Sequence, residues 1–406
     1  MKKYFIFAAA ALVALAACSK VETDETASQR EITFELAKYS TQTKANETAL
    51  NSEMVNGNAI TDFYTNAWYH PNATDAAQAY MVDQRISFIA GNATTAAKWA
   101  PNGRTYFWPK TGYINFFSYA GAPAPTAKAE NSLTYGTAAS PLTIGTGANI
   151  LIADAAYAYS DNNTDNDDPI WHKDYVAEGV PTLFRHALAK LTLDVRFDAT
   201  GIENKYTFDV DVISASVKVN NQGYLDIAYT PQTTKGTAHW STPASTEKIG
   251  WVPANVEYVA IDAPSTAISG TLEAEATPDI HCVGGTVTGK AVNTPLVLIN
   301  ENTVMPQAMT DNAVLNITYK VRTTYTDNDN PSLNTTITEQ VPLTNVLLTK
   351  FKYNNNNTLT PINSWEMNTK YTYHITIRPG GVVLFDPAVE PWTVYANEPN
   401  YTYPEN

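Results

Sequence analysis

Two stretches decide the fold: Leu315-Asn316-Ile317-Thr318-Tyr319-Lys320-Val321 and Tyr371-Thr372-Tyr373-His374-Ile375-Thr376-Ile377. In each, an apolar or aromatic residue alternates with a polar one, so an extended chain places all the apolar side chains on one face. This period of two is typical of a β-strand with one buried face. The same alternation recurs at Leu191, Leu193, Val195 and Phe197.

The composition extends this pattern to the whole chain of 406 residues. Aromatic residues make up 11% of it and charged residues only 16%, a balance that suits half-buried pleated surfaces. No long segment carries apolar residues at helical spacing. We therefore expect an all-β protein of antiparallel sandwiches with few, short helices, in which Tyr113–Tyr119 is a central strand and residues 121–147 form a long loop.

The N-terminus has the pattern of an exported lipoprotein. Lys2 and Lys3 precede an apolar run that is too short to span a bilayer, and the run ends in Leu15-Ala16-Ala17-Cys18. This order is a lipobox, in which the cysteine thiol receives a lipid after cleavage. We expect residues 1–17 to be a signal peptide, Cys18 to be the lipidated residue, and residues 18–30 to be an acidic tether.

The rest of the chain is long enough for about two domains. We place their boundary near Pro181–Phe184, before the Leu191 alternation, which gives an N-terminal domain of residues 31–183 and a C-terminal domain of residues 184–406. The first domain opens with Ile32, Phe34 and Leu36 on one face of an expected strand. A polar loop from residue 40 to 58 follows.

Several function classes are disfavoured by the sequence. A formal net charge of −14 repels nucleic-acid backbones. The six histidines and two cysteines lack ligand spacing, and catalytic motifs are absent, so we expect neither an enzyme nor a cofactor or metal site. The acidic run Asp161–Asp168 has part of the spacing of a calcium loop, but it lacks the glycine and the glutamate of that motif. A solvated loop there is the simpler interpretation.

Taken together, several segments resemble one family, the FimA- and Mfa-like fimbrillins of Bacteroidales. Their order along most of the chain carries the resemblance. The segments are Leu15–Cys18, Ile32–Phe34 with Thr43–Ala45, Phe107–Pro109 with Phe116–Tyr119, Phe184–Leu191, Met305–Gln307, and Trp365 to Trp392 with Lys370–Tyr373, Phe385–Pro387 and Pro391-Trp392.

The resemblance implies two tandem transthyretin-like sandwiches and assembly by strand exchange after proteolysis. The removed first strand would hold Ile32, Phe34 and Leu36, and the cut would fall between Lys44 and Ala45. Family subunits commonly carry arginine at the cut, so lysine here leaves the protease open. A donor strand for the next subunit would come from Val382–Phe385 or Trp392–Tyr395.

The expected function is therefore that of a structural, tip or accessory subunit of a surface fimbria with a role in adhesion. The expected location is the surface of the outer membrane, with palmitate-type acylation at Cys18, and the expected partners are other fimbrial subunits and a host or bacterial surface ligand. The alternative is a monomeric glycan-binding surface lipoprotein of a polysaccharide-uptake system. The early strand followed by a loop with a basic residue discriminates between the fimbrial and the glycan-binding hypotheses, because polymerisation needs this arrangement and glycan binding does not.

Overall fold

The computed structural model describes residues 31–36, 62–109, 112–160, 179–182, 184–229, 240–241, 250–253, 258–263, 280–283, 286–288, 295–355, 358–379 and 383–391. Nearly all regular structure in these ranges is β, and the helical turns in them are the two 3-10 turns Pro331–Leu333 and Leu348–Lys350. The chain is thus an all-β protein, as the alternating sequence predicts. No helix in the described ranges is long and apolar enough to cross a membrane.

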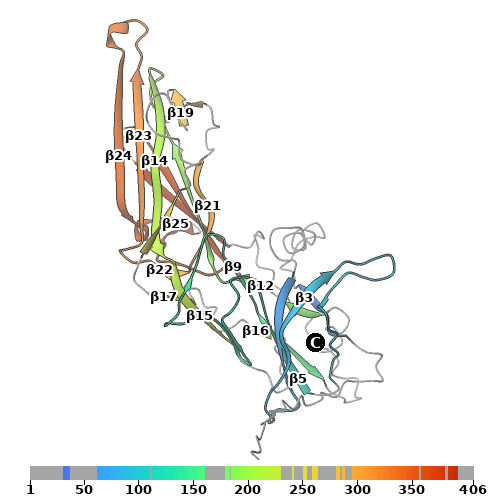
Figure 1. The fold of residues 1–406 in the computed structure, drawn as a ribbon. Helices are drawn as coiled ribbons and strands as arrows, with labels where there is room; N and C mark the ends of the chain where they lie inside the picture. Colours follow the sequence, from blue (N-terminus) through green and yellow to red (C-terminus); the bar gives the residue numbers. More distant parts are fainter. Residues whose placement is uncertain are drawn as a thin grey trace, which may run out of the picture.

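Ten strands form the N-terminal sheet, at the lower right of Figure 1. Their order is β11-β1-β4-β3-β2-β5-β10-β16, with β9 beside β5 and β12 beside β9. The strands are β1 (Phe34–Leu36), β2 (Asp62–His70), β3 (Gln78–Ile89), β4 (Lys98–Pro101), β5 (Gly112–Ala122), β9 (Asn149–Ala153), β10 (Ala155–Ser160), β11 (Val180–Thr182), β12 (Phe184–His186) and β16 (Trp240–Ser241).

The N-terminal sheet curls around its own core. The ring of Phe34 on β1 lies 5.6 Å from that of Phe63 on β2 and 5.8 Å from that of Phe116 on β5, measured between centroids. These strands are three and four places away in the sheet order. Neighbouring strands are about 4.8 Å apart, so a flat sheet would separate them by roughly 14–19 Å. The sheet therefore folds back and encloses one hydrophobic core.

Two further sheets pack face to face in the second half of the chain. The four-stranded sheet has the order β21-β13-β28-β29, and the six-stranded sheet has the order β20-β19-β14-β23-β24 with β18 beside β14. The strands of the first are β13 (Ala189–Phe197), β21 (Leu296–Val304), β28 (Thr369–Ile377) and β29 (Val383–Pro391). Those of the second are β14 (Tyr206–Asn220), β18 (Tyr258–Asp262), β19 (Ile280–Val283), β20 (Thr286–Thr288), β23 (Val314–Tyr325) and β24 (Thr335–Leu347).

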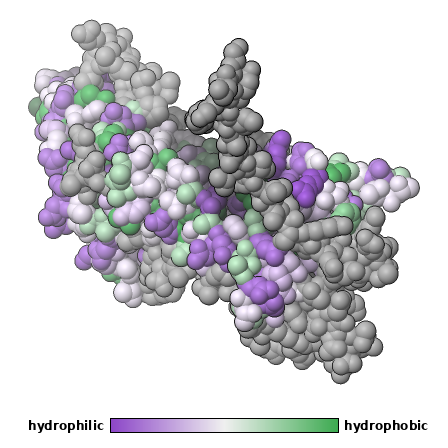
Figure 2. All heavy atoms as spheres, turned by 60° about the horizontal axis from the view of Figure 1, so that its bottom comes forward, coloured by the Kyte–Doolittle hydropathy of each residue, from purple (hydrophilic) through white to green (hydrophobic). Residues whose placement is uncertain are grey.

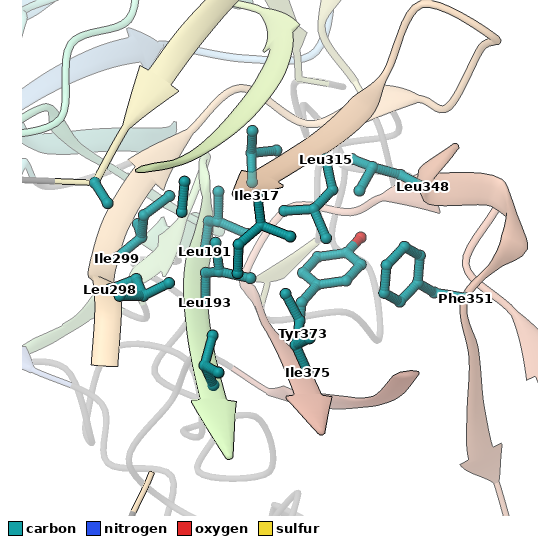
Figure 3. Packing of buried hydrophobic residues seen from close by; sticks show 14 of the residues in the cluster. Leu191, Leu193, Leu298, Ile299, Leu315, Ile317, Leu348, Phe351, Tyr373 and Ile375 are labelled. Atoms are coloured by element: carbon teal, nitrogen blue, oxygen red, sulfur yellow. The ribbon is translucent and has the colours of Figure 1, made fainter. Parts of the chain in front are cut away.

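The alternating residues that define these strands meet between the two sheets. Leu191 and Leu193 on β13 and Tyr373 on β28 face Leu315 and Ile317 on β23 (Figure 3). All five side chains are fully buried. Their polar neighbours on β13 and β28 point to the other face, as strand geometry requires. This core is the sandwich that the sequence predicts.

A five-stranded middle sheet joins the two halves. Strand β15 (Gln222–Ala228) comes from the second half, and it pairs with β7 (Ser132–Tyr135), β8 (Leu142–Thr143) and β17 (Val252–Pro253), while β6 (Ala127–Ala129) pairs with β7. In Figure 1, β15 and β17 lie between the strands of the N-terminal sheet and β14. A third core, with Tyr135, Leu225 and Trp251, is shared by both halves.

The middle sheet changes two expectations. Residues 121–147 were expected to be a loop, but they contain β6, β7 and β8. Strand pairing also crosses the expected boundary at residues 183/184, because β12 pairs with β9 and β15 pairs with β7. The division into domains of residues 31–183 and 184–406, and their transthyretin-like character, stay predictions.

The remaining strands form two small antiparallel pairs. These are β22 (Gln307–Ala308) with β27 (Ser364–Trp365), and β25 (Lys352–Asn355) with β26 (Thr358–Pro361). Among the strand pairs that the structure describes, β1 with β11 and β13 with β28 are parallel, and the others are antiparallel.

Candidate functional site

The candidate site is the place that strand β1 occupies in the N-terminal sheet. Strand β1 lies between β11 and β4 and has only three residues. It runs parallel to β11, with Phe34 opposite Val180 and Leu36 opposite Thr182, and antiparallel to β4, with Phe34 opposite Trp99. The first strand is thus an internal strand of its sheet, with a neighbour on each side.

The three apolar side chains of this segment point into the core, as their alternation predicts. Ile32 is 1% exposed, Phe34 is 2% exposed and Leu36 is 7% exposed. The ring of Phe34 makes edge-to-face contacts with Phe63 and Phe116, a favourable geometry for aromatic pairs. We call the space that holds these side chains, with its flanking strands β4 and β11, the β1 seat.

Backbone hydrogen bonds hold the N-terminal end of the segment. The Ile32 amide donates to the carbonyl oxygen of Tyr106 at 2.8 Å, and the Val180 amide donates to the carbonyl oxygen of Thr33 at 2.8 Å. Next to Ile32, Glu31 forms an ion pair with Lys98 on β4 at 2.6 Å. Both of these ionic groups are partly exposed, so we assign the pair little stabilisation.

Gly179, the residue before β11, lets the backbone at the start of β11 approach β1 closely. Its φ of +102° lies in a region that favours glycine. A Cβ atom at this position would lie 2.7 Å from the carbonyl carbon of Phe34. The glycine therefore allows a backbone approach that a side chain would prevent. Sequence reasoning missed both Gly179 and β11, because a three-residue strand is too short to show a period; the only signal was a glycine before a β-branched residue.

Side-chain burial dominates the stability of β1. Burying one large apolar side chain contributes roughly 1.5–3 kcal/mol, so the three together contribute on the order of 5–9 kcal/mol as an upper bound. Each backbone hydrogen bond adds only about 1 kcal/mol net. Another strand with apolar side chains at the same three positions could replace β1 with little loss.

Tyr80 supports the wall beside β1. Its hydroxyl donates a hydrogen bond to the carbonyl oxygen of Phe107, the residue that forms an isolated bridge with Glu31. Burial raises the pKa of Tyr80 to about 12, so the hydroxyl stays neutral and keeps its proton to donate. This hydrogen bond gives the wall segment one anchor that does not involve β1.

Strand β12 of the N-terminal sheet carries an ionisable side chain, that of His186. Phe184 on β12 packs its ring 5.4 Å from that of Phe63, a wall residue of the seat. Two residues on, burial and the nearby Lys190 lower the pKa of His186 to about 3. The imidazole Nδ1 lies 3.1 Å from Oδ1 of Asn149. His186 is therefore neutral at pH 7, on the same short strand as Phe184.

Other sequence-predicted residues lie outside the described part of the chain. These are Cys18, Lys44, Ala45 and the run Asp161–Asp168. Lipidation at Cys18 and cleavage at Lys44–Ala45 stay predictions. Among the described residues, no group of three His, Cys, Asp or Glu side chains is arranged to hold a metal ion.

The two candidate donor segments differ in what the structure describes. Trp392–Tyr395 lies outside the described residues, as does Val382. Residues 383–385 belong to β29, which pairs along its whole length with β28 at the edge of the four-stranded sheet. To serve as a donor, this segment would have to leave its own sheet.

Among the tryptophans whose burial the structure describes, Trp68 is partly buried. Trp99, Trp108, Trp251 and Trp365 are 4%, 6%, 3% and 0% exposed, respectively. Figure 2 shows hydrophilic and hydrophobic residues interspersed over the coloured part of one face, without a broad hydrophobic area there. The four buried rings cannot stack on a sugar, whereas Trp68 is partly accessible.

No family model and no curated protein matches the chain. Among solved structures it is similar to a candidate cell adhesion protein from Bacteroides uniformis (14% identity, TM-score 0.38, 89% of this chain and 98% of that one). It is also similar to one from Parabacteroides distasonis (14%, 0.38, 82% and 94%) and to the fimbrial anchor protein Mfa2 from Porphyromonas gingivalis (10%, 0.25, 82% and 89%). The names of these structures refer to cell adhesion or to a fimbria.

Proposed function

We propose that this chain is a structural, tip or accessory subunit of a surface fimbria with a role in adhesion, and that it assembles by strand exchange at the β1 seat. The observation that carries the proposal is the β1 seat itself. A three-residue internal strand fills a deep apolar site at the start of the chain. The family resemblance of the sequence supports the same assignment. The proposal gives the chain no catalytic role.

Removal of β1 would leave a site that favours another strand. Strands β4 and β11 would each lose a neighbour, and Phe63 and Phe116 would lose their contacts with Phe34. Unpaired strand edges and exposed apolar walls are both unfavourable, and one incoming strand satisfies both. The contact is heterologous, so repetition gives a filament rather than a closed dimer.

Removal requires a cut between β1 and β2. The segment between them, residues 37–61, is polar over residues 40–58 and carries two basic residues, Lys38 and Lys44. A cut after Lys44 breaks the covalent link that keeps β1 at its high effective concentration in the seat. A cut between Arg30 and Glu31, in contrast, would leave β1 attached.

The proposed location follows from the N-terminus. Acylation of Cys18 holds the exported precursor on the outer membrane, because each buried methylene of the acyl chains adds about 0.8 kcal/mol. The partners are other fimbrial subunits and a host or bacterial surface ligand. Cys18→Ala should abolish palmitate labelling and release the protein. Undiminished labelling of that variant would exclude the anchor.

Trypsin cleavage of a purified Lys38→Ala variant tests the mechanism. Lys44 is then the only basic residue between β1 and β2, and the new N-terminus should be Ala45. We expect the cut protein to form ladders on gels run without boiling, and Lys38→Ala/Lys44→Ala to stay monomeric. In cells that carry Lys38→Ala, the further change Lys44→Ala should prevent filaments, and the control variant Arg30→Ala should not.

Two results together would overturn the proposal. One is a cut protein that loses residues 31–44 yet stays monomeric at high concentration. The other is a normal display of filaments by Lys38→Ala/Lys44→Ala cells. Binding of a purified polysaccharide by the uncut monomer would then favour the surface glycan-binding alternative.

A further inference from the structure

The outer edge of β24 presents a second strand-pairing surface, far along the chain from β1. Strand β24 has thirteen residues and is the last strand in the order of the six-stranded sheet, where it pairs with β23. Every residue from Thr335 to Gln340 is exposed, and the side chain of Ile337 is 57% exposed. In Figure 1, β23 and β24 lie at the opposite end of the molecule from the N-terminal sheet.

Part of this edge lacks the usual protection against pairing. Edge strands are commonly protected by lysines, prolines, bulges or short length. Strand β29, the edge of the four-stranded sheet, carries Pro387 and Pro391. In β24, Pro342 and the register shift opposite Leu315 and Ile317 protect only the C-terminal part. Residues 335–341 contain a single ionisable residue, Glu339.

We propose that the β24 edge pairs with the β24 edge of a second copy of this chain, antiparallel about a two-fold axis. An edge can pair with its own copy in an isologous contact, which closes at two molecules. The proposal is independent of strand exchange at the β1 seat, because it needs no cleavage.

Proline placement and charge select the register. A proline on an edge strand turns its missing N–H away from the sheet, so Pro342 assigns the outward amides to Thr336, Thr338 and Gln340. With Thr338 on the axis, residues 335–341 pair without including Pro342. An axis at Glu339 would oppose two like charges, and an axis at Ile337 would pair only residues 335–339.

The Thr338 register also gives compatible side-chain neighbours. Thr338 meets its own copy, a pair type that is favourable across strands. Glu339 lies opposite Ile337, so no two carboxylates are opposed. The remaining opposed pairs are Thr336 with Gln340 and Thr335 with Val341. This complementarity within the chain's own sequence identifies the partner as a second copy.

The contact should be weak in dilute solution and respond to salt. Seven paired residues per chain give an interface at the low end of the size of specific contacts. Each copy carries a formal net charge of −14, so repulsion between the copies opposes association at low ionic strength. We expect the dimer fraction to rise with protein concentration and with salt up to about 0.2 M.

Cysteine cross-linking tests the register in the uncut chain. In a Cys18→Ser/Cys282→Ser background, Thr338→Cys places two thiols opposite each other, where Cα atoms about 4.5–5.5 Å apart permit a disulfide. Thr336→Cys is the matched control, because its copies would be offset by four residues, about 13 Å. We expect at least tenfold more covalent dimer from Thr338→Cys than from Thr336→Cys.

A second pair of variants tests association without cross-linking. Thr338→Pro removes an outward amide and should abolish the dimer in sedimentation, while Thr338→Ala keeps the amide and should keep the dimer. Thermal melting checks that Thr338→Pro folds. If that variant does not fold, the cysteine cross-linking experiment still tests the proposal, because it does not use the proline variant. Equal or negligible cross-linking by the two cysteine variants, or a strictly monomeric chain at every concentration, overturns the proposal.

Discussion

Strands β1 and β24 are opposites in length and in burial. Strand β1 has three residues, and all the apolar side chains of its segment are less than a tenth exposed. Strand β24 has thirteen residues, and its first six are all exposed. Strand β1 has two neighbours and apolar side chains deep in a core, whereas β24 has one neighbour, and its exposed first half is held mainly by backbone pairing. Strand length therefore does not measure how strongly a strand is held.

The difference also predicts what each strand can exchange. If β1 is exchanged as we propose, the incoming strand must supply apolar residues at matching positions, so the β1 seat would select for sequence. A strand edge offers amides and carbonyl groups, so the β24 edge selects mainly for register. The three predictions below test this contrast.

The largest effect is expected from truncating the core side chain of β1. Phe34→Ala should lower the free energy of unfolding by about 3–5 kcal/mol, the usual cost for a buried aromatic residue. The matched change on β24, Ile337→Ala, should cost less than about 0.5 kcal/mol, because that side chain is already exposed. Denaturant unfolding of both variants measures the difference. Equal losses of unfolding free energy in the two variants would contradict the proposed difference between β1 and β24.

Acid should weaken the β1 region more than the β24 edge. The pKa of His186 is lowered to about 3 in the folded chain, while an unfolded histidine titrates near 6.5. Between these values the unfolded state binds more protons, so the stability that is present above pH 6.5 falls as the pH is lowered towards 3. One such group gives at most about 1.4 kcal/mol per pH unit.

The His186→Gln variant isolates this contribution. Between pH 6.5 and 4.5 its free energy of unfolding should fall less steeply than that of the unchanged chain. Hydrogen exchange at the Phe34 amide should accelerate in acid in the unchanged chain only, and exchange at the Ile337 amide should be similar in both. Identical dependence of the unfolding free energy on pH in the two proteins would show that His186 does not cause the loss of stability in acid.

The smallest effect concerns the close approach at Gly179. Gly179→Ala brings a Cβ atom against the backbone of Phe34, whereas Gly201 has a similar φ of +83° and open space around it. Both substitutions strain the backbone, but only the first also displaces β1. We expect Gly179→Ala to cost about 1–2 kcal/mol more than Gly201→Ala in thermal unfolding. A cost no larger than that of Gly201→Ala would show that β1 tolerates the added atom.

The sequence predicts the strands that have one buried face. The alternation at Leu315–Val321 and Tyr371–Ile377 lies in β23 and β28, and their apolar residues all face the core. Tyr113–Tyr119 is central, as expected, because β5 lies between β2 and β10. These predictions hold because a period of two over seven residues is a local property that tertiary contacts reinforce.

Short strands and distant pairings could not be predicted in this way. Strands β6, β7 and β8 have two to four residues each, too few to distinguish a period from a turn-rich loop. The parallel pairing of Leu191 with Tyr371 joins residues far apart in the chain, and no local pattern specifies that register. The β1 seat was missed for the same reason: the sequence predicts the strand, but not the neighbouring strand β11 that follows Gly179.

The pairing of β15 with β7 has a mechanical consequence. The peptide link between the two halves, near residue 184, is not their sole connection, because Leu225–Ala228 also pairs with residues 132–135 and packs into the shared core. Tension applied to the ends of the molecule would be divided between the covalent chain and these hydrogen bonds. The halves should therefore yield together under a stretching force, and single-molecule pulling should show one rupture where a simple tether between independent domains would show two.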